Sequence, residues 1–360
     1  MTVSGEPRVP RTLTYAEAVN DALHVAMASD PSVICYGLGV DDPKTIFGTT
    51  KGLQTRFGDQ RVFDMPTAEA AMTGVAIGAA LGGMRPVMVH QRLDFFLLAM
   101  DQLVNGAAKW HYMFGGQRSV PITIRLILGR GWGQGPTHSQ SLHAWFAHIP
   151  GLKVVMPTNP EDAKGLLLAS IFDPNPVLFL EHRWLHNTMG SVPEGDYRIP
   201  LGKARQLREG DAVTIVSMSY MTVEALHAVD HLRQSDVHCD LLDLRTVSPL
   251  DWDAVFASVR RTGRLLVLDT AAETGSIAGE IAARAAIECW TLLKSAPQRI
   301  AMPDIPEPTS FGLTRGLHPR AEHIVAAVAA LVGKQIGVDE LVARRTVPHD
   351  VPGDWFKGPF

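Results

Sequence analysis

Short apolar runs alternate with longer stretches of helical periodicity over most of this chain, and the alternation predicts its fold class. In the first half the candidate strands are 33–36, 87–90, 122–128, 153–156 and 177–181, and the candidate helices are 15–29, 69–81, 96–114 and 160–172. Strands and helices that alternate in this way form parallel sheets with helices on both faces. The pattern therefore predicts an α/β protein.

A polar segment at 189–201 interrupts the alternation, because Gly190, Pro193, Gly195 and Pro200 favour turns there. A second alternating run follows, with strands at 212–218, 239–243 and 265–269 and helices at 223–233, 250–260, 278–290 and 321–332. A chain of 360 residues is long enough for two cores. We therefore predict two doubly wound domains, at 12–190 and 201–335, and an irregular tail at 336–360.

Glu69 is the first candidate functional residue, because it directly precedes 70–84, an uncharged stretch rich in Ala and Gly. A carboxylate at the start of a buried helix costs free energy unless a partner shares or accepts a proton. Glu69 therefore either caps this helix or serves a ligand. Thr14, Thr67 and Asn159 stand where helix N-caps are expected, and Pro160 suits a first helical position.

A glycine-rich loop, Gly129–Gly135, follows the strand at 122–128 and precedes His138. The loop satisfies neither GxGxxG nor GxxxxGK[ST], which argues against a nucleotide site. Its glycines instead favour close approach of the backbone to a ligand or a subunit. His138 is either a proton-transfer residue or a capping or surface histidine. The chain has no GxSxG motif, which argues against a serine hydrolase.

The strand at 87–90 ends in a polar segment that contains His90, Gln91, Arg92 and Asp94. Ligands of α/β proteins bind at the carboxyl ends of strands, so this segment is a second candidate site. The alternative is that these residues only cap the next helix and pair Arg92 with Asp94.

Composition narrows the function classes further. Charged residues make up 19% of the chain, hydrophobic residues 46%, and the basic residues are scattered, so no nucleic-acid surface is expected. The uncharged stretch at 70–84 is too short for a membrane span, and residues 1–11 lack an apolar signal core, so we expect a cytoplasmic protein without a membrane partner. Cys35, Cys239 and Cys289 are expected to be buried thiols.

Several short motifs occur in one order along the two predicted domains. They are 65–69 (MPTAE), 82–86 (GGMRP), 101–109 (DQLVNGAAK), 138–140 (HSQ), 150–157 (PGLKVVMP), 162–164 (DAK), 243–246 (DLRT) and 249–251 (PLD). Together they resemble the β subunit of the E1 component of 2-oxoacid dehydrogenases, one of the transketolase-like thiamine diphosphate enzymes. The resemblance spans Leu13 to Gly333. It implies a thiamine-diphosphate pyrimidine-binding domain followed by a transketolase C-terminal-like domain.

The resemblance also implies roles for individual residues. In such proteins the carboxylate at the position of Glu69 hydrogen-bonds N1′ of the aminopyrimidine and turns its 4′-amino group into a base. Thr67, Gln91 and Phe95 fall at cofactor-contacting positions, and His138 at the substrate side of the thiazolium. A structural K⁺ is implied at backbone carbonyls of this chain, namely those of Ile122, Ser170, Asp173 and Asn175.

Similar enzymes hold the diphosphate through Mg²⁺ with a GDG motif, which this sequence lacks. The resemblance therefore implies an α-type E1 subunit that supplies this motif in an α2β2 heterotetramer. The implied reaction is decarboxylation of a 2-oxoacid and transfer of the acyl unit to a lipoyl acyltransferase or another acceptor. The alternative is a transketolase-like carboligase that forms acyloins in a specialised biosynthetic pathway.

The segment Val89–Arg92 departs from the usual acidic and apolar residues of that family. Its polar and basic character predicts a bulkier or anionic substrate, with His90 and Arg92 on the substrate side next to His138. Two other classes compete with the enzyme subunit. A non-catalytic scaffold subunit is disfavoured by the presence of both Glu69 and His138, and a nucleotide-binding dehydrogenase lacks its glycine fingerprint.

Overall fold

The computed structural model describes residues 10–42, 46–131 and 133–358, which form two compact units. The first unit contains the residues up to 127 together with 149–181 and 185–201. The second contains 128–148, 182–184 and the residues from 202 onward. Residues 128–148 follow the strand predicted at 122–128 and belong to the second unit. In the sequence they lie in the middle of the first alternating run.

The first unit is built on a parallel sheet with strand order β6-β7-β5-β4-β2-β3. These strands are β2 Val33–Gly37, β3 Val62–Asp64, β4 Arg85–His90, β5 Thr123–Leu128, β6 Lys153–Val155 and β7 Val177–His182. β2, β5 and β7 are buried along their whole length, as expected of central parallel strands. A separate antiparallel pair joins β1 Pro10–Thr14 to β8 Met189–Pro193, so the start of the predicted linker is a strand.

The helices of the first unit pack in groups. α1 Tyr15–Ser29 lies against α7 Pro160–Ile171, and α3 Glu69–Leu81 lies against the segment that follows β4. The predicted helices 15–29 and 69–81 are confirmed, and α7 ends one residue before its predicted boundary. Two further short helices are α2 Leu53–Phe57 and the 3₁₀ turn η1 Ile46–Gly48. α4 Leu93–Phe96 and α5 Ala108–Met113 complete this unit.

Local capping explains where these helices begin. Thr14 and Glu17 form a capping box on α1, and the Asn159 side chain accepts the Asp162 amide at the start of α7. Both predicted caps are confirmed. The prediction for Thr67 is wrong, because the N-cap of α3 is Ala68, which makes no side-chain cap hydrogen bond.

The predicted single helix at 96–114 is also wrong. The chain there passes from α4 into a 3₁₀ turn, η2 Leu97–Ala99, then a π-helix, η3 Gln102–Ala107, and then α5. η3 packs on α3 so tightly that a Cβ on Gly106 would lie 3.1 Å from Ile77 Cδ1. This close packing, which the periodicity of 96–114 does not reveal, accompanies the change in helix type.

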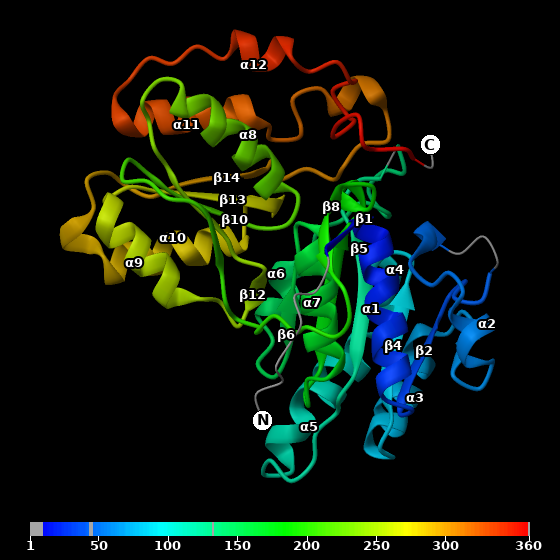
Figure 1. Cartoon of the computed structure of the whole chain (residues 1–360). Helices are drawn as coiled ribbons and strands as arrows, with labels where there is room; N and C mark the ends of the chain where they lie inside the picture. The colour runs from blue at the N-terminus through cyan, green and yellow to red at the C-terminus, as the bar shows by residue number, and fades with distance from the viewer. Residues whose placement is uncertain (1–9, 43–45, 132, 359–360) are drawn as a thin grey trace. The chain divides into compact units, whose positions relative to one another are not determined.

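The second unit has a five-stranded sheet in the order β14-β13-β10-β11-β9, in which only β9 is antiparallel. Its strands are β9 Arg205–Arg208, β10 Thr214–Ser217, β11 Asp240–Asp243, β13 Leu265–Ala272 and β14 Gln298–Met302. α8 Met221–Arg233 and α11 Ala321–Val332 cover one face, and α9 Trp252–Thr262 and α10 Ile277–Glu288 cover the other (Figure 1). Both units are therefore α/β, as predicted.

Shorter elements complete the second unit. They are α6 His143–Ala147, η4 Arg183–Leu185, β12 Thr246–Ser248, η5 Trp290–Leu292, η6 Phe311–Thr314 and α12 Asp339–Ala343. The tail predicted to be irregular over 336–360 contains the helix α12, and only the chain after α12 is irregular. The three cysteines are free and buried, as predicted. Among the described residues, no helix is long and apolar enough to cross a bilayer.

Candidate active site

The carboxyl ends of β2, β3 and β4 meet at one edge of the first sheet. Gly37 at the end of β2 pairs with Asp64 of β3 on one side and with Val89 of β4 on the other. A Cβ on Gly37 would lie 2.0 Å from the Val89 carbonyl oxygen, so only glycine allows this close approach. The polar segments that follow β3 and β4 therefore leave the sheet from the same edge.

Asp64 links the segments that follow β2 and β3 at this edge. Its Oδ1 accepts the amide of Gly39, which follows β2, at 2.8 Å and the amide of Met65 at 2.9 Å. The side chain thus fixes the start of the connection from β3 to α3. The sequence did not reveal this role, although an Asp at the end of a strand is a recognised signal for a side-chain-stabilised turn.

Glu69 is the first residue of α3 and is buried, with 4% of its surface exposed. Its backbone carbonyl accepts the Thr73 hydroxyl at 2.8 Å. Among the described residues, none donates a hydrogen bond to its carboxylate or forms an ion pair with it. The capping alternative is excluded because α3 has no side-chain cap. A buried carboxylate without a donor fits a ligand that brings a donor of its own.

The other predicted cofactor contacts lie around the same edge. Thr67 is exposed in the turn before α3, and Phe95 is half-buried on α4. Gln91 is half-buried, and its Nε2 donates to the Leu38 carbonyl at 3.4 Å, which links the segment after β4 to the segment after β2. Arg92 is buried, with 3% exposed. The sheet thus brings these residues to the edge that carries Glu69.

His90, the last residue of β4, is fully buried in the first unit. Its ring packs edge-on against Phe96, with centroids 5.0 Å apart. Neither ring nitrogen has a hydrogen-bond partner among the described residues. Burial lowers the pKa of His90 to about 4, so the ring is neutral near pH 7. A direct substrate contact would require this side chain to become accessible.

The predicted cation-binding carbonyls lie at the opposite, amino-terminal edge of the sheet. The Ile122 carbonyl accepts the Val177 amide at 3.0 Å, and the Ser170 carbonyl accepts the Asp173 amide at 3.2 Å. The Asp173 carbonyl accepts Arg85 Nη1 at 3.3 Å, and the Asp173 carboxylate accepts the Asn175 amide at 2.9 Å. The structure therefore gathers these residues at the start of β7, where Arg85 already supplies a positive charge.

His138 lies in the second unit, half-buried in the loop between β5 and α6. Its Nδ1 is 3.0 Å from the Thr137 hydroxyl, and its amide donates to the Gly135 carbonyl at 3.3 Å. The loop glycines approach other residues of this chain closely, and their approach to a ligand or a subunit stays a prediction. A Cβ on Gly129 would lie 2.4 Å from His182 Nε2, and one on Gly135 would lie 2.3 Å from Thr309 Oγ1. The neighbours are side chains of the second unit.

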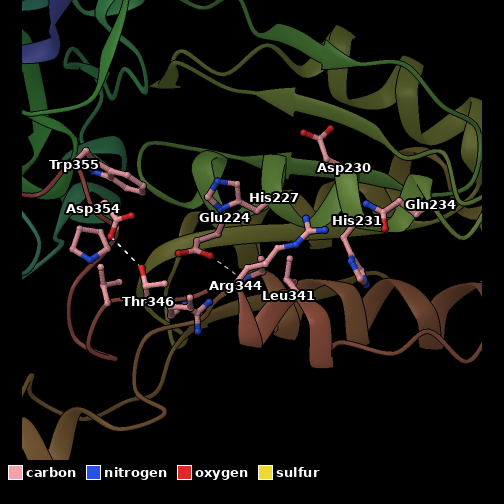
Figure 2. A pocket seen from close by; sticks show the side chains of 15 residues that line it. Glu224, His227, Asp230, His231, Gln234, Leu341, Arg344, Thr346, Asp354 and Trp355 are labelled. Atoms are coloured by element: carbon pink, nitrogen blue, oxygen red, sulfur yellow. Dashed lines mark hydrogen bonds between the residues drawn. The ribbon is translucent and has the colours of Figure 1, made fainter.

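A cavity of about 430 Å³ occurs elsewhere in the second unit, between α8 and the segment around α12 (Figure 2). Glu224 at its wall is already satisfied, because it accepts Arg320 Nη1 and the Ala321 amide, each at 2.9 Å. No residue of the predicted site lines this cavity. Glu224 therefore gives no indication of a ligand in this cavity.

Comparison with known proteins agrees with this architecture. The family model "Transketolase, pyrimidine binding domain" matches residues 11–188, and "Transketolase, C-terminal domain" matches residues 202–324. A solved structure, "Split gene transketolase, inactive beta4 tetramer", covers 91% of this chain and 99% of its own, with a TM-score of 0.70 and 20% identity. At that identity the match supports the fold. The two family matches and the fold thus define a two-domain, transketolase-like protein.

Curated relatives narrow the class. The acetoin:2,6-dichlorophenolindophenol oxidoreductase subunit beta of Cupriavidus necator is 42% identical, covering 88% of this chain and 96% of the relative. The 2-oxoisovalerate dehydrogenase subunit beta of Bacillus subtilis is 41% identical, covering 82% and 90%. The mitochondrial pyruvate dehydrogenase E1 component subunit beta-2 of Oryza sativa is 40% identical, covering 88% and 85%. This chain belongs to that family of transketolase-like dehydrogenase β subunits.

Proposed function

We propose that this chain is the β-type subunit of a thiamine-diphosphate-dependent, E1-like 2-oxoacid dehydrogenase. The observation that carries the proposal is Glu69, a buried carboxylate without a donor at the carboxyl edge of a pyrimidine-binding domain. Thiamine diphosphate, when bound, supplies a carbon acid that adds to a 2-oxo group and accepts the electrons released on decarboxylation. The substrate is a 2-oxoacid, and the acyl acceptor is a lipoyl domain or another carbonyl compound.

Glu69 would share a proton with N1′ of the aminopyrimidine. That hydrogen bond satisfies the carboxylate and increases the basicity of the 4′-nitrogen across the ring. The half-buried ring of Phe95, with Thr67 and Gln91, would hold the pyrimidine against the sheet edge. Because these residues come from segments fixed by the ends of β3 and β4, the sheet itself sets their geometry.

His138 would hold or transfer a proton at the substrate, since an imidazole changes protonation near neutral pH. Arg92 would favour the carboxylate of an anionic substrate, because a buried guanidinium attracts such a group strongly. His90 is assigned to the substrate side only in a conformation that exposes it.

The diphosphate and its Mg²⁺ would be held by an α-type subunit in an α2β2 assembly, because the chain contains no Gly-Asp-Gly sequence. A K⁺ at the carbonyls of Ile122, Ser170, Asp173 and Asn175 would have to replace Arg85 Nη1 at the Asp173 carbonyl. Oxygen ligands suit such a hard cation. We place the enzyme in the cytoplasm, where it could meet a lipoyl acyltransferase.

Glu69→Gln in the reconstituted αβ complex tests this proposal. The amide keeps the shape of the side chain but cannot take up a proton, so turnover should fall by about 10²–10⁴-fold. Deuterium exchange at C2 of bound thiamine diphosphate, followed by NMR, should slow in parallel, and it needs no substrate. Glu209→Gln, which alters an exposed carboxylate of the second unit, is the matched control. Unchanged C2 exchange in Glu69→Gln would refute the assignment.

A carboligase is the second candidate, and the similarity to acetoin oxidoreductase subunits favours it. Cleavage and formation of an acyloin use the same addition to a carbonyl group as 2-oxoacid decarboxylation. Parallel assays with pyruvate, branched-chain 2-oxoacids and acetoin, with and without an aldehyde acceptor, distinguish the two. Acyloin formation or cleavage that exceeds lipoyl acylation would favour the carboligase.

A further inference from the structure

Arg130 precedes His138 in the same loop. It attaches the start of this loop to the rest of the second unit. This guanidinium is 2% exposed. Its Nη1 donates to the Pro308 carbonyl at 2.9 Å and to Glu307 Oε1 at 3.4 Å, and its Nη2 donates to Asp350 Oδ2 at 3.2 Å. A buried guanidinium with two carboxylate partners fixes the loop at its start.

A second attachment follows His138 by five residues. His143, the first residue of α6, places its Nε2 2.8 Å from Asp269 Oδ1, and both side chains are fully buried. The Asp269 carboxylate also accepts the amides of Ala271 at 2.9 Å and Ala278 at 3.2 Å. Burial alone would raise the pKa of Asp269, but His143 and the two amides lower it. Asp269 is therefore an anion, and His143 Nε2 carries the proton of this hydrogen bond.

The two attachments lie close to each other. Arg130 and Asp269 both line one cavity of about 30 Å³ in the second unit, which has room for about one water molecule. The loop between the attachments is rich in glycine, and glycine loses more conformational freedom on ordering than any other residue. Contacts at the two ends of the loop therefore help to keep His138 in an ordered position.

We propose that His143 and Asp269 form a positioning pair that fixes the His138 loop for proton transfer. The proposal rests on the role assigned to His138 above, and it adds two residues that would touch neither substrate nor cofactor. The pair acts through the start of α6. Its hydrogen bond holds that helix to β13 and so limits where the preceding residues, Ser139 and His138, can lie.

The chain offers matched variants for a test. His143→Leu removes the donor, whereas His143→Gln places an amide N–H close to the position of the imidazole Nε2. His148→Leu makes the first substitution at an exposed histidine just after α6 and serves as the control. Asp269→Asn, which keeps the shape of the carboxylate, tests the pair from its other side and remains informative if His143→Leu fails to fold.

Two measurements are made on each variant. Amide hydrogen exchange of residues 133–142 is followed in the full-length chain, and kcat and KM are measured in the reconstituted complex. His143→Leu should speed exchange in this loop and lower kcat by about 10- to 100-fold with KM changed less than about threefold. His143→Gln should restore most of both properties, and Asp269→Asn should lie between the two.

Unchanged loop exchange and kcat in folded His143→Leu would overturn the proposal. Loss of kcat in His143→Gln equal to that in His143→Leu would also overturn it, because the donor would then not be the reason for the effect. The exchange measurement needs no cofactor. Failure of the positioning pair is therefore distinguishable from failure of the thiamine assignment, which the C2 exchange of Glu69→Gln tests separately.

Discussion

Glu69 and His90 at the edge of the first sheet differ from the Arg320–Glu224 pair of the second unit in whether their buried polar groups have partners. At the edge, Glu69 has a carboxylate without a donor, and His90 has two ring nitrogens without partners among the described residues. In the second unit, Arg320 and Glu224 are equally buried, but each is hydrogen-bonded to the other. The bonded pair holds the second unit together, whereas Glu69 and His90 are places where a ligand or a conformational change could supply a partner.

The largest effect expected from this comparison follows the loss of Arg320. Its guanidinium donates to Glu224 at 2.9 Å and to the carbonyls of His349 and Val351, so it fastens the end of the chain as well. Arg320→Met leaves the Glu224 carboxylate buried without its cation. The free energy of unfolding, measured in urea, should fall by about 3–5 kcal/mol. Arg315→Met, at an exposed arginine, should change it by less than about 0.5 kcal/mol.

The ring of His90, which has no hydrogen-bond partner among the described residues, should make the free energy of unfolding depend on pH. Burial lowers its pKa in the folded chain to about 4 from an ordinary value of 6.5. Below pH 6.5 the unfolded chain therefore binds a proton that the folded chain does not. The stability that the neutral ring contributes is complete above pH 6.5 and is lost as the pH falls toward 4. Between pH 7.5 and pH 5 the loss should be about 2 kcal/mol.

His90→Leu should remove this pH-dependent loss, because leucine has no proton to bind. Urea unfolding of wild type and variant at both pH values gives the difference directly. His227→Leu, at an exposed histidine of α8, should leave the pH dependence of the wild type in place. If His90→Leu retained the full loss of stability between pH 7.5 and pH 5, His90 would have a partner or an exposed state that this structure does not contain.

The sequence predicted those parts of the fold that depend on neighbouring residues. Helix α1 begins at its capping box and α7 at Asn159 and Pro160, because a cap is formed by residues within one turn. The change to a π-helix at 102–107 was not predictable in this way, since it accompanies packing against Ile77 on α3. Likewise, β8 pairs with β1, far away in the sequence, so its residues looked like a linker.

The residues of the candidate site also differ in whether their positions depend on nearby or on distant parts of the sequence. The position of Glu69 at the start of α3 was predictable because its motif, 65–69, is contiguous and leads directly into that helix, whereas its role stays a prediction. The pair His143–Asp269 was not, because 126 positions separate the two residues and neither has an unusual neighbour in sequence. The burial of His90 also depends on packing, and a polar residue at a strand end gave the opposite expectation. Long-range partners, more than residue types, limit what a single sequence reveals.

The smallest expected effect on the free energy of unfolding comes from a comparison of an exposed charge pair with a more buried one. Arg344 and Glu340 form an exposed pair one turn apart near α12, with side-chain exposures of 63% and 59%. Arg345 and Glu322 form a more buried, two-bonded pair nearby, at 2.8 and 2.9 Å, with exposures of 23% and 17%. Burial opposes ionisation of Glu322, but the Arg345 guanidinium still lowers the pKa of that carboxyl.

The same substitution at both carboxylates therefore measures how far burial decides the contribution of a pair. Glu340→Gln should lower the free energy of unfolding by no more than about 0.5 kcal/mol, because water screens the exposed pair. Glu322→Gln should lower it by about 1.5–3 kcal/mol, because charge-assisted hydrogen bonds are lost where water replaces them poorly. Equal losses in the free energy of unfolding would mean that burial does not increase the contribution of a charge pair. The large effect expected for Arg320→Met would then no longer follow from the burial of Arg320.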